Sequence, residues 1–173
     1  MQNSLFKQLG YFVIIMAIQI MIMSNINFGG YINPYIYVLF ILLLPFDIKG
    51  WVLLIAAFGT GLIIDLFSDT QGMHAAASVF MAFARPGIIS MITGRTDFDP
   101  GSIPQISLMG AKWVTMYSVV LILLHHSLLF FLEIFRFSEF FLTLGRILAS
   151  SGITFIMVML GFLFLDSPGK KGR

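Results

Sequence analysis

The sequence alternates long apolar runs with short polar turns, and this alternation restricts the folds open to it. In the clearest example, two apolar runs between Gly59 and Pro86 meet at the turn Ser68–Gly72. Only 10% of the 173 residues are charged and 58% are hydrophobic, whereas soluble domains carry about 25% charged residues. Such a chain cannot cover a water-facing surface, so the sequence predicts an all-α integral membrane protein.

Six apolar runs could be membrane spans, at about 20 residues for each crossing. The expected spans are residues 9–23, 31–46, 51–67, 73–92, 106–132 and 142–165. They leave no room for a soluble domain, so we expect a single transmembrane domain, residues 1–173, folded as a six-helix bundle. No small-residue cleavage site follows the first run, which favours a retained span over a signal peptide.

Two of the expected spans have unusual lengths. Residues 31–46 form a short span, and Tyr31, Tyr35 and Tyr37 at its start are typical of an interfacial aromatic belt. Residues 106–132 are long enough to tilt in the bilayer or to project beyond it. Within the first span, Gln19 is the one strongly polar residue, and we expect it to face another helix.

Lys and Arg residues near the span ends divide unequally between the two sides of the expected membrane. One side holds Lys7, Lys49, Arg95, Lys170, Lys171 and Arg173, and the loops of the other side hold only Arg136. Because positive residues favour the cytoplasmic side, we expect both termini in the cytoplasm. The turn Ser68–Gly72 then faces outward.

Asp65 and His74 lie at the same expected depth on either side of this turn. An ionisable residue inside an apolar span costs about 2.5–3.5 kcal/mol on insertion scales, so it needs a partner or a function. A hydrogen bond between the two side chains would be either a proton-linked or metal-binding pair, or a structural latch. We favour the latch, because a metal site needs three or four ligands and the hairpin offers these two residues and Asp69.

Arg85 lies about 18 Å along the fourth expected span from its start, at 1.5 Å per residue, too far to pair with Asp65. We expect it to pair with Asp47 or to reach a lipid phosphate. Pro86 follows immediately and would kink the helix. The alternative is a broken helix at a binding site, as in transporters.

Small residues recur at helical spacing on three of the expected spans, where they would let helix backbones approach closely. The two faces of the hairpin, which we expect to pack together, are Ala57, Gly61 and Asp65, and His74, Ser78, Ala82 and Arg85. A comparable face on the last span is Gly145, Ala149, Gly152 and Ile156. Helix packing is the favoured interpretation of all three.

Two further features stand near the outer ends of the last two spans. His125 and His126 are adjacent, so their side chains point about 100° apart on a helix and we expect them not to serve one site. Residues 128–141 are rich in bulky apolar side chains, Phe137 and Phe141 among them. Such a surface is typical of the core of an interface, although lipid contact explains it equally well.

The order of polar and small residues in the hairpin resembles the MreD family of rod shape-determining membrane proteins, in particular members from Bacteroidetes. The matching residues are Gly61, Leu62, Asp65, Gly72, His74, Ala75, Arg85 and Pro86, with residues 44–47 upstream. The resemblance implies a six-helix fold similar to the substrate-binding components of energy-coupling factor transporters. It also implies a non-enzymatic scaffold of the cell-wall elongation complex in the bacterial inner membrane, which maintains rod shape.

The partners that the resemblance implies are an MreC-type protein, the actin-like MreB, RodA and a class B penicillin-binding protein. The alternative function is the substrate-binding component of a small-molecule, vitamin-type uptake transporter. That function requires an outward-opening polar cavity, which Asp65, His74 and Gln19 could line.

An intramembrane enzyme is disfavoured, because the sequence has no HExxH motif, no GxSG motif and no paired aspartates in facing spans. We expect no cofactor and no metal. The absence of cysteine excludes disulfides and cysteine nucleophiles, and a net charge of +2 is too small to indicate nucleic-acid binding.

Overall fold

The computed structural model of the chain describes residues 2–22, 32–94, 98–134 and 140–166, which are helical or irregular and include no strand. The helices are α1 (Gln2–Met21), α2 (Val38–Leu42), α3 (Gly50–Ser68), α4 (Met73–Thr93), α5 (Ile106–Met109), α6 (Ala111–Ile134) and α7 (Phe140–Leu165). Helices α3, α4, α6 and α7 are each long and apolar enough to cross a membrane. The chain is therefore an all-α protein of the multi-pass membrane type.

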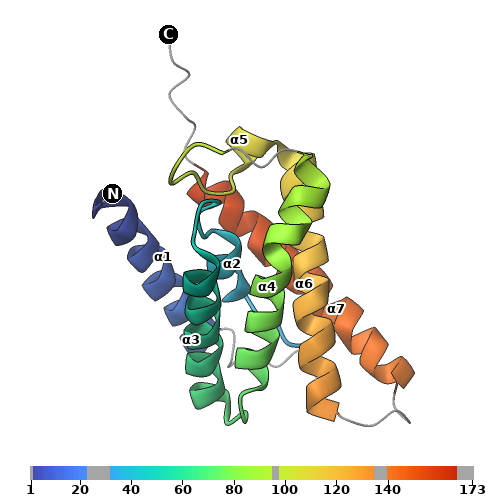
Figure 1. The fold of residues 1–173 in the computed structure, drawn as a ribbon. Coiled ribbons are helices and arrows are strands. Elements are labelled where there is room, and N and C mark those ends of the chain that lie inside the picture. The colour runs from blue at the N-terminus through green and yellow to red at the C-terminus, as the bar shows by residue number, and fades with distance from the viewer. Residues whose placement is uncertain (1, 23–31, 95–97, 135–139, 167–173) are drawn as a thin grey trace.

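The long helices form one layered bundle (Figure 1). Helix α4 packs between α3 and α6, and α6 packs in turn against α7, while α1 contacts the bundle through α2. The first residues of α1 and the last residues of α7 lie at the end of the bundle that carries α5. At that end the Asp166 carboxylate accepts hydrogen bonds from the backbone N–H of Ser107, at 3.0 Å, and from its hydroxyl, at 2.6 Å.

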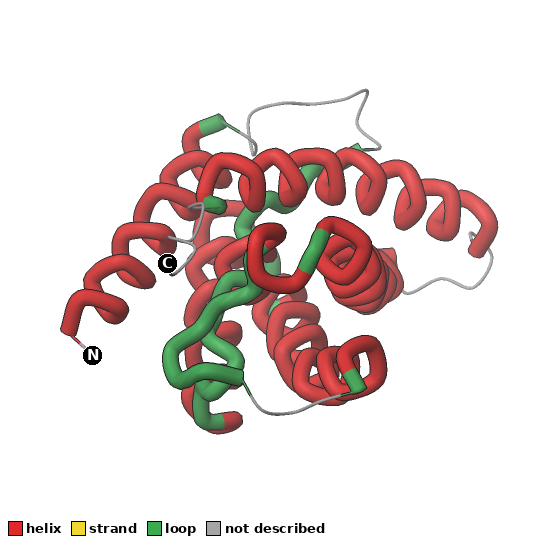
Figure 2. The backbone as a smooth tube through the Cα atoms, turned by 90° about the horizontal axis from the view of Figure 1, so that it is seen from above, coloured by secondary structure: helices red, strands yellow, loops and turns green. Residues whose placement is uncertain are grey.

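The expected span 31–46 is wrong as a helix, since only residues 38–42 of it are helical. The rest of its described part is irregular chain that runs through the inside of the bundle (Figures 1 and 2). Every residue from Tyr37 to Leu44 is at most 8% exposed. We call residues 32–46 the buried segment. A helix satisfies its own backbone, but an irregular chain in an apolar interior needs hydrogen-bond partners from elsewhere.

Side chains of α1 and α7 supply those partners at the start of the buried segment. The Gln19 amide donates to the carbonyl of Pro34 and accepts from the backbone N–H of Tyr37, both at 3.3 Å. Two hydroxyls of α7 accept neighbouring N–H groups: Ser150 from Asn33 at 3.1 Å, and Thr154 from Tyr35 at 3.0 Å. Gln19 was expected to face another helix; it is buried, and these two hydrogen bonds are to irregular backbone.

The expected span 106–132 is also divided. Helix α5 ends at Met109, Gly110 adopts a positive φ of 83°, and α6 starts at Ala111. Glycine adopts such a conformation without the steric cost that a side chain brings. The long, tilted helix is therefore wrong, and α6 alone is the membrane-type helix of this region.

The small-residue faces of the α3–α4 hairpin are buried as expected. A Cβ atom added at Gly61 would lie 2.5 Å from both the Cα of Ala75 and the carbonyl oxygen of His74. These are backbone atoms, which cannot move aside as the end of a flexible side chain could. Gly61 is thus the point where α3 and α4 come close enough for their backbones to touch.

The comparable face on α7 is not covered by any other described part of this chain. Gly145, Ala149, Gly152 and Ile156 are all exposed, so the helix packing expected for them does not take place among the described helices of this chain. The opposite face of α7 is turned inward, and its buried residues include Thr143, Ser150, Ser151 and Thr154. Because the buried segment needs hydroxyl partners, the hydroxyl-bearing face of α7 is the one that the bundle encloses.

We predict that Gly61→Ala destabilises the protein by about 1–3 kcal/mol, the usual cost of overpacking a well-packed core. The matched control is Gly59→Ala on the same helix, where an added Cβ meets nothing within 4 Å and alanine should be neutral or stabilising. Thermal unfolding of the detergent-solubilised variants measures the difference. Equal melting temperatures for the two variants would show that the backbones do not touch at Gly61.

Candidate functional site

Asp65 is a cap that reaches from the end of α3 to the start of α4. One carboxylate oxygen accepts from the Thr70 hydroxyl at 2.5 Å and from the His74 backbone N–H at 3.0 Å. The other accepts from the Ala75 backbone N–H at 2.9 Å. The first N–H groups of a helix lack intrahelical partners and carry partial positive charge, so a carboxylate suits this position. The latch exists, but the expected bond to the His74 imidazole is wrong, because the donor is the backbone.

The turn between the two helices brings α4 back onto Asp65. Asp69 adopts a φ of 52° and Gly72 a φ of 83°, both left-handed. The backbone N–H groups of Asp69 and Thr70 both donate to the Asp65 carbonyl. The turn requires a left-handed residue at position 72, a conformation that favours glycine. Gly72 therefore has a structural role and has no side chain that could take part in chemistry.

The His74 imidazole belongs to a buried cluster. Its Nδ1 lies 3.0 Å from the Tyr37 hydroxyl, which lies 2.6 Å from Nε2 of His125. Nδ1 of His125 lies 3.4 Å from Nδ1 of His126, whose Nε2 is 3.1 Å from the Thr154 hydroxyl. Tyr37 is fully buried, so its expected place in an interfacial belt is wrong.

The expectation that His125 and His126 serve different surroundings is also wrong. Both are fully buried and both belong to this cluster. Helix α6 lies between α4 and α7 (Figure 1), so two directions about 100° apart on it both meet protein. His125 points to Tyr37 and His126 points to Thr154.

The hydrogen bonds of the cluster fix one consistent set of neutral imidazoles. Nδ1 of His126 lies 3.0 Å from the Ile122 carbonyl, which can only accept, so that nitrogen carries the hydrogen. Nδ1 of His125 faces the same hydrogen and is an acceptor, which leaves its Nε2–H to donate to Tyr37. The Tyr37 hydroxyl then donates to Nδ1 of His74, and the hydrogen of His74 is on Nε2.

Arg85 is 1% exposed and binds the far end of the buried segment. Its Nε donates to the Tyr117 hydroxyl at 2.7 Å, and its terminal nitrogens donate to the carbonyls of Leu44 and Pro45. The Tyr117 hydroxyl donates to the carbonyl of Leu42 at 3.0 Å. Leu42 is the last residue of α2, where carbonyls lack intrahelical partners. Leu44 and Pro45 follow α2, and the five donors of a guanidinium can serve both of their carbonyls.

The partners expected for Arg85 are therefore wrong. It contacts neither Asp47 nor the surface: Asp47 is exposed and accepts from the backbone N–H of Gly101 at 3.1 Å. The broken-helix alternative is also wrong, because α4 continues through Pro86 to Thr93. Pro86 lies on the exposed side of that helix.

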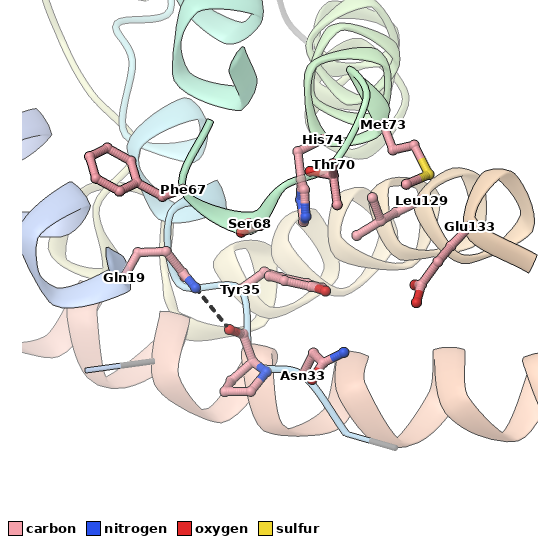
Figure 3. A pocket seen from close by; sticks show the side chains of 11 residues that line it. Gln19, Asn33, Tyr35, Phe67, Ser68, Thr70, Met73, His74, Leu129 and Glu133 are labelled. Atoms are coloured by element: carbon pink, nitrogen blue, oxygen red, sulfur yellow. Dashed lines mark hydrogen bonds between the residues drawn. The ribbon is translucent and has the colours of Figure 1, made fainter. Parts of the chain in front are cut away.

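A cavity of about 320 Å³ lies at the end of the bundle that carries the α3–α4 turn (Figure 3). Its polar lining comprises Gln19, Asn33, Tyr35, Ser68, Thr70, His74 and Glu133. Its apolar lining comprises Pro34, Phe67, Met73 and Leu129. We call this cavity the polar pocket. Of the three residues expected to line such a cavity, Gln19 and His74 do so, and Asp65 does not.

The outer aromatic edge is described only in part. Phe137 lies outside the described residues. Phe141, in the first turn of α7, is 84% exposed. Beside it, Glu133 of α6 forms an ion pair with Arg146 of α7 at 3.0 Å, and the Arg146 guanidinium lies 4.6 Å from the centre of the Phe130 ring.

No family model, curated protein or solved structure matches the chain. Within the described residues, no group of three or more His, Asp or Glu side chains could hold a metal ion.

Sequence reasoning missed the parts played by Tyr37, Tyr117 and Thr154. The signal for the last was the run of hydroxyl residues Ser150, Ser151 and Thr154, which share a helix face and are all buried. The two tyrosines carried no signal of burial, since tyrosine in an apolar run is also typical of membrane interfaces.

We predict that Asp65→Asn destabilises the protein by about 1–3 kcal/mol, because an amide cannot accept from all three donors and leaves a buried N–H unsatisfied. A double-mutant cycle of Asp65→Ala with Thr70→Val should show coupling, since each of these variants removes the hydrogen bond between the two side chains. The matched cycle with His74→Ala should be close to additive, since His74 contributes its backbone. Thermal stability in detergent measures both cycles. Strong coupling to His74→Ala would contradict this prediction and would support a hydrogen bond between the Asp65 and His74 side chains.

Proposed function

We propose that this chain is a non-enzymatic membrane scaffold of the bacterial cell-wall elongation complex, as its resemblance to the MreD family implies. In this role it maintains rod shape by binding an MreC-type protein, with MreB, RodA and a class B penicillin-binding protein as further partners. The observation that carries the proposal is the exposed face of α7.

That face combines one large aromatic residue with a run of small ones. Phe141, Gly145, Ala149, Gly152 and Ile156 follow one another at intervals of three or four residues, so they share a side of the helix, and all five are exposed. We call this surface the α7 outer face. Lipid contact does not require small residues, whereas close approach of a second helix does. We therefore propose that the transmembrane helix of an MreC-type protein packs here.

The buried ionisable groups support a structural role. Asp65 accepts from backbone N–H groups at the start of α4, and Arg85 donates to backbone carbonyls of the irregular chain that follows α2. These hydrogen bonds hold the fold together, and a charged group committed to them is not free to react. The arrangement suits a protein that presents a rigid surface.

In the proposed topology the chain crosses the bacterial inner membrane six times, with both termini in the cytoplasm. The crossings are α1, the buried segment, α3, α4, α6 and α7, an arrangement that we propose to be similar to the substrate-binding components of energy-coupling factor transporters. The Lys and Arg asymmetry supports this orientation.

We predict that a reporter fused after Lys170 is active in the cytoplasm and that a reporter inserted at Gln71 is active outside. The reason is the excess of positive residues on the side of the termini. Paired fluorescent-protein and alkaline-phosphatase fusions measure the two positions. Phosphatase activity from the fusion after Lys170, or fluorescence from the fusion at Gln71, would contradict the proposed topology.

We predict that Gly152→Leu and Phe141→Glu reduce capture of the MreC-type partner while the chain still inserts and folds. The leucine would hold a partner helix away, and the glutamate would place a charge in the interface. The matched control is Gly87→Leu on the exposed side of α4, which should leave capture unchanged. Co-purification from native membranes, with thermal stability measured in parallel, tests this. Normal capture by both α7 variants would place the interface elsewhere.

A second candidate function is favoured by the polar pocket. A substrate-binding component of a small-molecule uptake transporter requires a polar cavity that opens outward, and the pocket lies beside the turn that we expect to face outward. The same co-purification discriminates between the candidates. An MreC-type partner supports the scaffold, and a stoichiometric vitamin with an ATPase module supports the transporter.

A further inference from the structure

The polar pocket has the composition of a small-molecule binding site. Such sites have apolar walls and a few convergent polar groups, and range from about 300 to 1,000 Å³. The pocket has a volume of about 320 Å³ and joins apolar side chains such as Phe67, Met73 and Leu129 to hydrogen-bonding groups. It is therefore large enough for a compact molecule that bears one ring.

His74 provides a fixed donor to the pocket. The side chain is 3% exposed, and Figure 3 shows its ring directed toward the pocket. Its Nδ1 is occupied by the Tyr37 hydroxyl at 3.0 Å. The hydrogen-bond order of the histidine cluster puts the hydrogen on Nε2, which leaves an N–H for a carbonyl or similar acceptor.

The charges around the pocket disfavour an anion. Among the described residues that line it, Glu133 is the charged one, and its carboxylate is paired with Arg146 at 3.0 Å. No described lysine or arginine lines the pocket to neutralise a carboxylate or phosphate. A net negative molecule would therefore lose its hydration without gaining an ionic partner.

The walls of the pocket are held in place by hydrogen bonds that do not involve a ligand. Gln19 is bound to the buried segment on both sides of its amide, and Thr70 is bound to the Asp65 cap. A preformed site avoids the entropic cost of ordering its side chains when a molecule enters.

We infer that the polar pocket binds a small uncharged molecule that has an apolar ring and a hydrogen-bond acceptor, and that Nε2–H of His74 donates to that acceptor. The ring contacts Met73 and Leu129, which lie together on one side of the pocket (Figure 3). This inference does not rest on the scaffold function, because the proposed partner contact is on α7 and the pocket is at the α3–α4 turn.

The absence of cysteine from the sequence allows a direct test. A single cysteine at Met73, a lining residue that is half-buried, would report on the pocket, and one at Gln71, which is exposed and outside the lining, is the matched control. The neutral reagent methyl methanethiosulfonate converts each thiol to a mixed disulfide and releases methanesulfinate. Benzamide and benzoate serve as competing probes, because they share a ring and differ in charge.

Benzamide at saturating concentration should slow modification of Met73→Cys several-fold, while benzoate should not, and neither should affect Gln71→Cys. Adding His74→Phe, which keeps a ring but removes the donor, should abolish the protection. If that variant does not fold, Leu129→Phe, which fills the pocket, should abolish it instead. The inference is overturned if neither probe protects, if both protect equally, or if protection survives in the folded His74→Phe or Leu129→Phe variant. Partner capture by the α7 outer face is measured separately and does not affect this result.

Discussion

The buried segment is the constraint on which the rest of the structure depends. Its irregular backbone passes through an apolar bundle, where each unsatisfied N–H or carbonyl group costs several kcal/mol. Four helices provide the missing partners: Gln19 comes from α1, Arg85 from α4, Tyr117 from α6, and Ser150 and Thr154 from α7. The polar residues of the apolar runs are thus explained mainly as partners for this one segment.

The backbone of the buried segment finds different hydrogen-bond partners at the two ends of the bundle. Toward the end with α5, Tyr117 donates to the last carbonyl of α2, and Arg85 donates to carbonyls of the chain that follows α2. At the end with the α3–α4 turn, the segment begins among amides, hydroxyls and imidazoles, and these groups leave the polar pocket between them. The turn itself is fixed independently, because the Asp65 carboxylate caps α4 and Gly61 lets the two helices touch.

The hydroxyl face of α7 is turned inward, so the small-residue face of the same helix is turned outward. The hydrogen bonds of the interior therefore determine which face of α7 is exposed to the proposed partner. A helix cannot present both faces to one bundle, so the residues that bind the buried segment determine which surface a partner can meet. The α7 outer face and the polar pocket lie on different parts of the molecule, which allows a structural role and ligand binding to be examined separately. The histidine cluster runs from His74, which lines the pocket, to Thr154 on the buried face of α7.

The sequence by itself determined the all-α membrane character, the α3–α4 hairpin and its buried small-residue faces, because low charge and helical spacing are local properties. It also placed Asp65 and His74 at one turn. Only the tertiary structure decided that Asp65 binds backbone rather than the His74 imidazole. It also decided that Arg85 binds the chain after α2 and that His125 and His126 share a cluster, because these partners lie on segments far apart in the chain. The buried segment could not be predicted either: its apolar run is indistinguishable from a short helical span until the side chains that satisfy its backbone are brought together.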